Sequence, residues 1–217
     1  MNPEKTKLMT NSTEKSISVN GVQIEYCSEY IYLGQTISMT GHWEKEINRR
    51  IGQTWGKFWS LKSIILEKSI RLNLRLEILK SCVLTVLTYG SQTWSLTKSQ
   101  TKKIQVCQRK MERKILDIKI KDKVKNEEVR KRSNIEDVAT IAKQLKWSWG
   151  GHVARMEQER WAYATMVWEP RMGKRARGRP RRRWANEFEE ELGKHWERKA
   201  MDREEWKNIV KEATHQS

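Results

Sequence analysis

The sequence contains few of the residues that mark secreted, membrane-spanning or zinc-binding proteins. Its three cysteines form neither a Cys-x-x-Cys pair nor an even set, so reduced thiols are expected rather than disulfides. None of the four histidines stands at a metal-ligand spacing from another histidine or a cysteine. The most apolar stretch, residues 70–89, is interrupted by four charged side chains, and the first residues lack the apolar core of a signal peptide. These absences predict a nuclear or cytoplasmic protein that is not secreted and has no membrane partner.

Catalytic motifs are missing as well. The sequence has no Gly-x-Ser-x-Gly elbow, no phosphate-binding loop and no dinucleotide fingerprint. Its acidic clusters, residues 189–191 and 204–205, lie on predicted helices whose charges alternate, which is typical of solvated faces. The predicted strands offer only Glu25 and Glu29, whereas two-metal phosphoryl transfer needs several carboxylates that converge. We therefore expect no metal site, no cofactor and no phosphoryl chemistry from this chain alone.

Positive charge is present in excess. Forty-four Lys and Arg against 27 Asp and Glu give a net charge of +17. The surplus lies in residues 98–132, with fourteen basic and five acidic side chains, and in residues 171–183, with eight basic and none acidic. Such patches bind phosphates and release counterions, so DNA or RNA is the predicted partner. For residues 98–132, a solvated helix face is an equally good interpretation.

The second basic segment contains Arg177-Gly178-Arg179-Pro180, which has the form of an AT-hook core. In such an arm, proline keeps the chain extended, glycine allows close approach, and arginines enter a narrow A·T-rich minor groove. The flanking basic residues are Arg175, Arg181, Arg182 and Arg183. The alternative is a basic linker that contacts phosphates without reading sequence, and general phosphate contact is the interpretation we favour.

The predicted fold class is mainly α, with a small β piece at the N-terminus. Alternating apolar residues around Asn20-Gly21 predict a hairpin, and residues 30–33 predict a third strand, hence a β-hairpin or three-stranded piece. Helical periodicity begins at Glu44 and continues to the end of the chain. The helix over residues 70–89 is apolar on two sides, which predicts a central position.

Several helix boundaries are also predicted. Thr97 and Gln100 form a capping-box pattern, and the four residues beginning at Ser133 look like another helix start. Gly150-Gly151 is expected to stop that helix, and Asp202 to begin the last one. Eleven tryptophans, seven of them after residue 146, indicate packed helices, with a core role favoured over exposed stacking platforms.

A series of short motifs runs in order along almost the whole chain. They are Asn2–Lys7, Tyr32–Gly34, Tyr89–Trp94, Asn126–Arg130, Trp149–Arg155, Arg160-Trp161, Gly178–Pro180, Arg183-Trp184, Asp202-Arg203 and Trp206. Together they resemble the C-terminal part of non-LTR retrotransposon reverse transcriptases, of the endonuclease–reverse transcriptase type. Gln92 is a mild departure, because relatives usually carry Glu there.

The resemblance implies a domain order. It consists of a palm-tail remnant with a primer-grip-like hairpin (1–40), a thumb-like helical bundle (41–120), a helical region (121–170), a basic linker or arm (171–183) and C-terminal helices (184–217). Lys5 or Lys7 would then stand where a lysine protonates the leaving pyrophosphate, and Tyr32, Leu33 and Gly34 would hold the primer end. The family's Mg²⁺-binding Tyr-x-Asp-Asp strand would lie before Met1, so a truncated copy is expected.

Three functional hypotheses follow. The first is a retrotransposon reverse transcriptase fragment that binds DNA or RNA, such as a template–primer duplex, but does not polymerise by itself. The second is an autonomous AT-hook-like, chromatin-associated DNA-binding protein. The third is an enzyme subunit that another chain completes with catalytic carboxylates.

Overall fold

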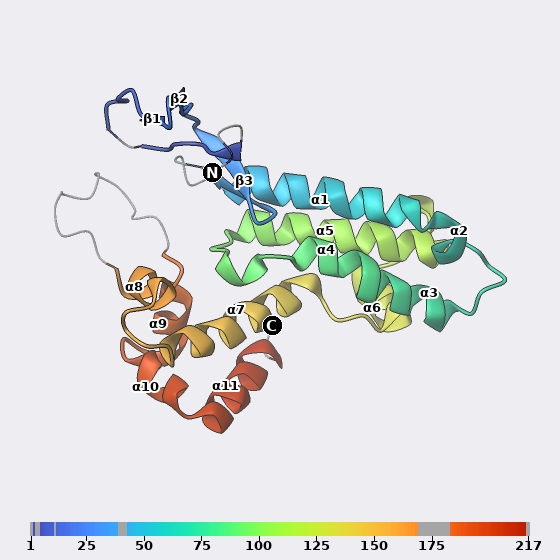
Figure 1. Ribbon diagram of the computed structural model, residues 1–217. Helices are drawn as coiled ribbons and strands as arrows, with labels where there is room; N and C mark the ends of the chain where they lie inside the picture. Colours follow the sequence, from blue (N-terminus) through green and yellow to red (C-terminus); the bar gives the residue numbers. More distant parts are fainter. Residues whose placement is uncertain (1, 3–4, 11, 39–42, 169–182, 216–217) are drawn as a thin grey trace. The chain divides into compact units, whose positions relative to one another are not determined.

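The computed structural model describes residues 2, 5–10, 12–38, 43–168 and 183–215 (Figure 1). The chain divides into two compact units, Met1–Arg49 and Arg50–Ser217, which are described separately. The described residues are mainly helical, with two small sheets near the N-terminus, which confirms the predicted fold class. Within these residues, every helix is too short or too polar to cross a lipid bilayer.

The first unit begins with the predicted hairpin. Strands β1 (Ser18–Val19) and β2 (Val22–Gln23) pair antiparallel. Between them, Asn20 and Gly21 have φ angles of 52° and 78°, as a two-residue turn of type I′ requires. The Asn-Gly signal was therefore sufficient to locate this hairpin.

The third predicted strand does not join that sheet. β3 (Glu29–Tyr32) pairs instead with a fourth strand, β4 (Gln35–Ser38), in a separate two-stranded sheet. Leu33 and Gly34 both have positive φ, so they form a tight turn directly after β3. The residues that follow this turn are therefore the nearest partners for β3. The sequence analysis missed β4 because Ile37 is the only apolar residue among its four positions.

From Trp43 onward, the regular structure of the described chain is helical. They are α1 (Trp43–Ser60), α2 (Lys62–Ile65), α3 (Leu72–Ile78), the π-helix η2 (Leu79–Leu84), α4 (Thr85–Thr88), the 3-10 turn η3 (Ser91–Thr93), α5 (Lys98–Ile115), the 3-10 turn η4 (Ile120–Asp122), α6 (Asn126–Ser133), α7 (Val138–Ala154), α8 (Trp161–Val167), α9 (Asn186–Leu192), α10 (Trp196–Met201) and α11 (Arg203–His215). In the second unit, the first part of α7 contacts α5, and α10 and α11 pack against α7 further along (Figure 1).

The segment from α3 to α4 is buried on one side rather than two. Leu76, Leu79 and Val83 lie in the core, whereas Leu74 is 52% exposed and Cys82 is exposed. The prediction of a helix buried on both sides was therefore wrong. A π-helical turn lies in the middle of this segment, and the single apolar stripe continues into the buried Leu87.

Helix α5 begins as its sequence predicts. The Thr97 hydroxyl accepts a hydrogen bond from the Gln100 backbone N–H, and the Gln100 side chain accepts one from the Thr97 N–H. This reciprocal capping satisfies two donors that the first turn of a helix otherwise leaves unpaired. The inner face of α5 buries Ile104, Met111 and Ile115.

Helix α7 differs from its prediction at both ends. Its N-cap is Asp137 rather than Ser133, because Ser133 ends α6 and Asn134 follows in a left-handed conformation. At the other end, the helix continues through Gly150 and Gly151 to Ala154. Both glycines lie under bulky aromatic rings, so they provide space for packing rather than a helix stop.

The C-terminal helices enclose an aromatic core. The rings of Phe188 and Trp196 stack with centroids 4.5 Å apart, and those of Trp147 and Trp206 stack at 5.8 Å. All four side chains are at most 3% exposed, which confirms the core role predicted for these tryptophans. Trp161 and Trp168, by contrast, are 85% and 66% exposed, so the prediction was wrong for them.

A buried ion pair supports this core. Glu187 accepts hydrogen bonds from Lys146 Nζ (2.9 Å) and from Trp147 Nε1 (3.0 Å), and Lys146 is only 5% exposed. Burial on its own raises the pKa of Glu187, but Lys146, Trp147 and Lys143 outweigh it and lower the pKa below the usual 4.5. Glu187 therefore stabilises the fold above the pKa that it has in the unfolded chain.

This arrangement predicts how stability depends on pH. The contribution of Glu187 is lost as the pH falls below about 4.5, through its lower folded-state pKa. At neutral pH, Glu187→Gln should lower the free energy of unfolding by about 2 kcal/mol, because the charge-assisted hydrogen bond that Glu187 accepts from the buried Lys146 is lost. Urea unfolding followed by tryptophan fluorescence measures both effects. If the variant had the same free energy of unfolding as the wild type at neutral pH, and lost it as steeply in acid, Glu187 would not have this stabilising role.

Candidate nucleic-acid interface

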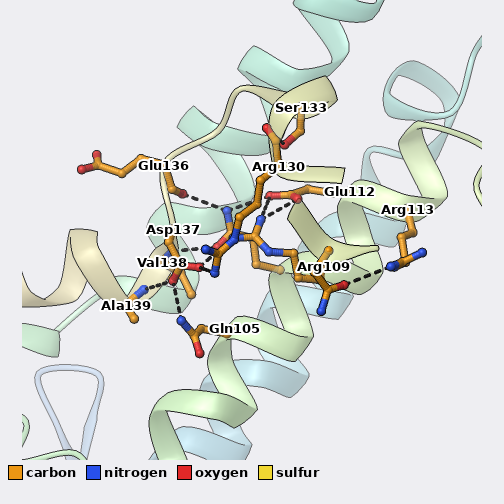
Figure 2. Close-up of polar contacts among 12 residues, drawn as sticks. Gln105, Arg109, Glu112, Arg113, Arg130, Ser133, Glu136, Asp137, Val138 and Ala139 are labelled. Atoms are coloured by element: carbon orange, nitrogen blue, oxygen red, sulfur yellow. Dashed lines mark hydrogen bonds and ion pairs between the residues drawn. The ribbon is translucent and has the colours of Figure 1, made fainter. Parts of the chain in front are cut away.

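A polar junction fixes α5 against the start of α7. Asp137 caps α7 by accepting from the Ala139 N–H at 2.9 Å, and its other oxygen accepts from Arg109 at 2.7 Å (Figure 2). Arg130 of α6 also pairs with Asp137, and Gln105 donates to it at 3.1 Å. Three helices thus meet at one carboxylate, which positions α5 within the second unit.

The same junction uses the only acidic residue of α5. Glu112 is fully buried and accepts from one Arg109 nitrogen through both carboxylate oxygens, at 2.6 Å each. Burial raises the pKa of Glu112, while Arg109 and Gln108 hold it down in part. Because this carboxylate faces inward, it does not offset the lysines on the outer side of the helix.

The outer face of α5 is cationic. At 3.6 residues per turn, the exposed positions of α5 from residue 102 onward fall within about 120° of the helix circumference. They include Lys102, Lys103, Val106, Lys110 and Lys114. Among the described residues, no carboxylate lies within ion-pair distance of Lys102, Lys110 or Lys114. The exposed lysines in this row are named here the α5 lysine face. They lie within the first basic segment, residues 98–132.

The structure places the primer-grip-like turn at an exposed position of the first unit. Tyr32 and Leu33 are 57% and 75% exposed, and Leu33 and Gly34 form the β3–β4 turn. Arg49 donates to the Gly34 carbonyl at 2.5 Å, and Glu46 accepts from the Thr36 N–H at 2.9 Å. The start of α1 therefore holds this hairpin and leaves its apolar tip uncovered.

The two candidate lysines of the N-terminal motif have different surroundings. Lys5 is exposed, and its backbone N–H donates to Asn2. Lys7 forms a 2.6 Å ion pair with Glu25, and this hydrogen bond raises the pKa of Lys7.

Most of the basic arm lies outside the described residues. This applies to Arg175, Arg177, Gly178, Arg179, Pro180, Arg181 and Arg182. Arg183 is described and is partly buried, and its backbone N–H donates to the Asn186 side chain at the start of α9. The next residue, Trp184, donates from Nε1 to the Gln92 carbonyl at 2.7 Å. The C-terminal end of the arm is therefore anchored to the second unit.

A two-metal centre needs several converging carboxylates. In the parts of the chain that the structure describes, no group of three or more His, Cys, Asp or Glu side chains is placed to hold a metal ion. The described residues therefore do not fit the Mg²⁺ ions of the polymerase family.

A comparison with known proteins gives the chain's origin. It is 30% identical to an uncharacterized transposon-derived protein of Caenorhabditis elegans, over an alignment of 236 residues that covers 99% of this chain and 83% of that protein. The chain belongs to this family of transposon-derived proteins. No family model matches it, and no solved structure does.

Sequence reasoning missed part of the candidate interface of this transposon-derived chain. It gave residues 98–132 as a basic segment without separating the inward Arg109 from the outward Lys102 and Lys110. Trp55 and Trp59 both lie on α1, and Trp59 is 45% exposed. The helical spacing of Lys102, Lys110 and Lys114 after the Thr97 cap was the signal that would have found the lysine face.

Proposed function

We propose that this transposon-derived chain is the nucleic-acid-binding, C-terminal part of a non-LTR retrotransposon reverse transcriptase, and that by itself it does not polymerise. The observation that carries the proposal is the α5 lysine face, where Lys102, Lys110 and Lys114 have no described carboxylate partner. Unpaired surface lysines along one helix face attract backbone phosphates, and their binding to phosphates releases counterions. The relative's transposon origin and the ordered motifs support the reverse transcriptase assignment.

The proposed partner is a DNA or RNA strand or duplex gripped through its phosphates. Phosphate contacts position a protein on nucleic acid without reading its sequence. On this proposal the basic arm adds further phosphate contacts from its own segment, next to the anchored Arg183. Template–primer binding without catalysis requires no metal ligands from the chain.

The AT-hook-like alternative rests on Arg177–Pro180, and a competition experiment separates it from the proposal. Binding of the full chain to a labelled duplex is challenged with unlabelled A·T-only and G·C-only duplexes. The proposal predicts equal competition, and an Arg179→Ala variant weakened to the same small extent on both. A preference for A·T that disappears in Arg179→Ala would support the alternative instead.

The absence of polymerase activity is tested by incubating the purified chain with template–primer, Mg²⁺ and deoxynucleotides. We expect retention of the template–primer without extension of the primer. Extension by the chain alone would overturn this part of the proposal, because it would require a carboxylate site in the chain. Extension only after adding a second, catalytic chain would support the subunit hypothesis.

A further inference from the structure

An aromatic groove lies beside the α5 lysine face. Two adjoining depressions, with volumes of about 400 and 720 Å³, run between α5 and the part of α1 in the second unit. Both are lined by Trp55 and Lys110. Lys102 and Lys103 line the first depression, and Trp59, Arg113, Lys114 and Lys119 line the second. The groove therefore places indole rings among cationic side chains.

The indole of Trp59 is held firmly, yet it is exposed. It stacks on Trp55 with centroids 6.0 Å apart and an interplanar angle of 26°, and it meets the edge of Phe58 at 5.3 Å. Phe58 is fully buried, so the cluster is anchored in the core, while 45% of Trp59 stays accessible. Lys114 Nζ lies 5.1 Å from the Trp59 ring centroid. A rigid ring with an accessible surface loses little entropy when a flat partner stacks on it.

The charge around the groove favours an anionic partner. Asp117 is the only carboxylate among the described lining residues, and it is paired with Lys68 at 2.7 Å. No described carboxylate forms an ion pair with Lys102, Lys110 or Lys114. A partner that carries flat rings and a negative charge at each repeat satisfies both features, and a single strand of nucleic acid is such a partner. A duplex fits less well, because its bases are stacked on one another and are not open to an indole.

We infer that the groove between α1 and α5 binds unpaired bases of a single-stranded nucleic acid, with Trp59 as the stacking surface and Lys102, Lys110 and Lys114 on the flanking phosphates. This rests on the proposed function and adds to it a preference for single strands over duplexes. Trp55 supports Trp59 from within the helix.

The test compares three labelled oligonucleotides of equal length by fluorescence anisotropy: a single strand, its duplex and an abasic strand with the same phosphates. Wild-type chain should bind the single strand more tightly than the abasic strand. Trp59→Leu should weaken single-strand binding by about 5- to 100-fold and leave the abasic strand and the duplex within about 2-fold, because stacking on one aromatic side chain contributes that much per base. Trp59→Tyr, which keeps an aromatic ring, should recover part of the loss.

The matched control is Trp161→Leu, at an 85% exposed tryptophan on α8. It should bind all three oligonucleotides as the wild type does, and circular dichroism should show that every variant is folded. If Trp59→Leu binds the single strand like the wild type, or if polyglutamate displaces the strand as well as a second oligonucleotide does, the inference is wrong while the proposed function stands. If no oligonucleotide binds at low ionic strength, the proposed function itself fails.

Discussion

Reversing two charges on the α5 lysine face, in the variant Lys102→Glu/Lys110→Glu, is expected to weaken nucleic-acid binding by about 10- to 100-fold at low ionic strength. Both side chains are exposed and have no described carboxylate partner, so glutamate replaces attraction to phosphate with repulsion. Lysine and glutamate have similar helix propensities, and the second new carboxylate would stand four residues before Lys114, a favourable spacing. The fold should therefore be retained, and anisotropy of a labelled oligonucleotide measures the loss.

The control carries the same change in net charge elsewhere. Lys194 and Lys199, before and within α10, are exposed, and the described residues give them no ion pair. Lys194→Glu/Lys199→Glu should lower affinity by no more than about 3-fold, since only long-range, screened repulsion is added. Equal losses in the two double variants would show that binding depends on net charge alone and not on the α5 lysine face.

The largest expected loss of stability comes from a single methyl group at Gly151. A Cβ there would lie 2.2 Å from Trp206 Nε1 and 2.3 Å from its Cδ1. Trp206 is 3% exposed and donates from Nε1 to the Trp147 carbonyl at 2.9 Å, so the rigid indole cannot move without breaking that hydrogen bond. Gly151→Ala should lower the free energy of unfolding by about 3–5 kcal/mol, from overpacking and the lost hydrogen bond together.

Gly52→Ala is the same chemical change, but it is expected to raise the free energy of unfolding. Gly52 lies within α1, and nothing stands within 4 Å of the position that its Cβ would take. Alanine has the higher helix propensity and reduces the freedom of the unfolded chain, so stability should rise by about 1 kcal/mol. Urea unfolding of both variants measures the contrast. A Gly151→Ala variant as stable as the wild type would mean that α11 does not pack closely on α7.

The sequence was most informative where local chemistry decides the structure. The Asn20-Gly21 turn and the Thr97–Gln100 capping box each complete their hydrogen bonds or backbone angles within a few residues, and both were predicted correctly. The last helix likewise begins after Asp202, whose carboxylate accepts from the Glu204 and Glu205 N–H groups. Such features depend little on the rest of the fold.

Predictions failed where a distant residue decides the outcome. Gly150 and Gly151 look like a helix stop until Phe188 and Trp206, more than thirty residues later, are seen to fill the space above them. In the same way, Asp137 rather than Ser133 caps α7, because Arg109 of α5 contacts that carboxylate. No periodicity in the local sequence encodes either contact.

The candidate interface was predicted only in part. Composition located the basic segment but did not separate its exposed residues from its buried ones. Lys110 is exposed, whereas its neighbour Arg109 is 5% exposed and pairs with two carboxylates. Trp59 belongs by spacing to the apolar stripe of α1 and nevertheless faces the lysines. Distinguishing them required knowing which face of each helix the core covers. The AT-hook-like motif of the basic arm stays a prediction from sequence, since it lies outside the described residues.

The central claim is that this chain binds nucleic acid through lysines that contact phosphates. Its most direct test is the affinity of the full chain for one oligonucleotide between about 50 and 200 mM salt, the range over which such contacts lose affinity steeply. We predict that the logarithm of the binding constant falls linearly with the logarithm of salt concentration, by about 0.9 per phosphate contacted, and that Lys102→Glu/Lys110→Glu reduces this slope by about 2. An oligonucleotide that is not retained even at the lowest salt, or an unchanged slope in the variant, would contradict the claim.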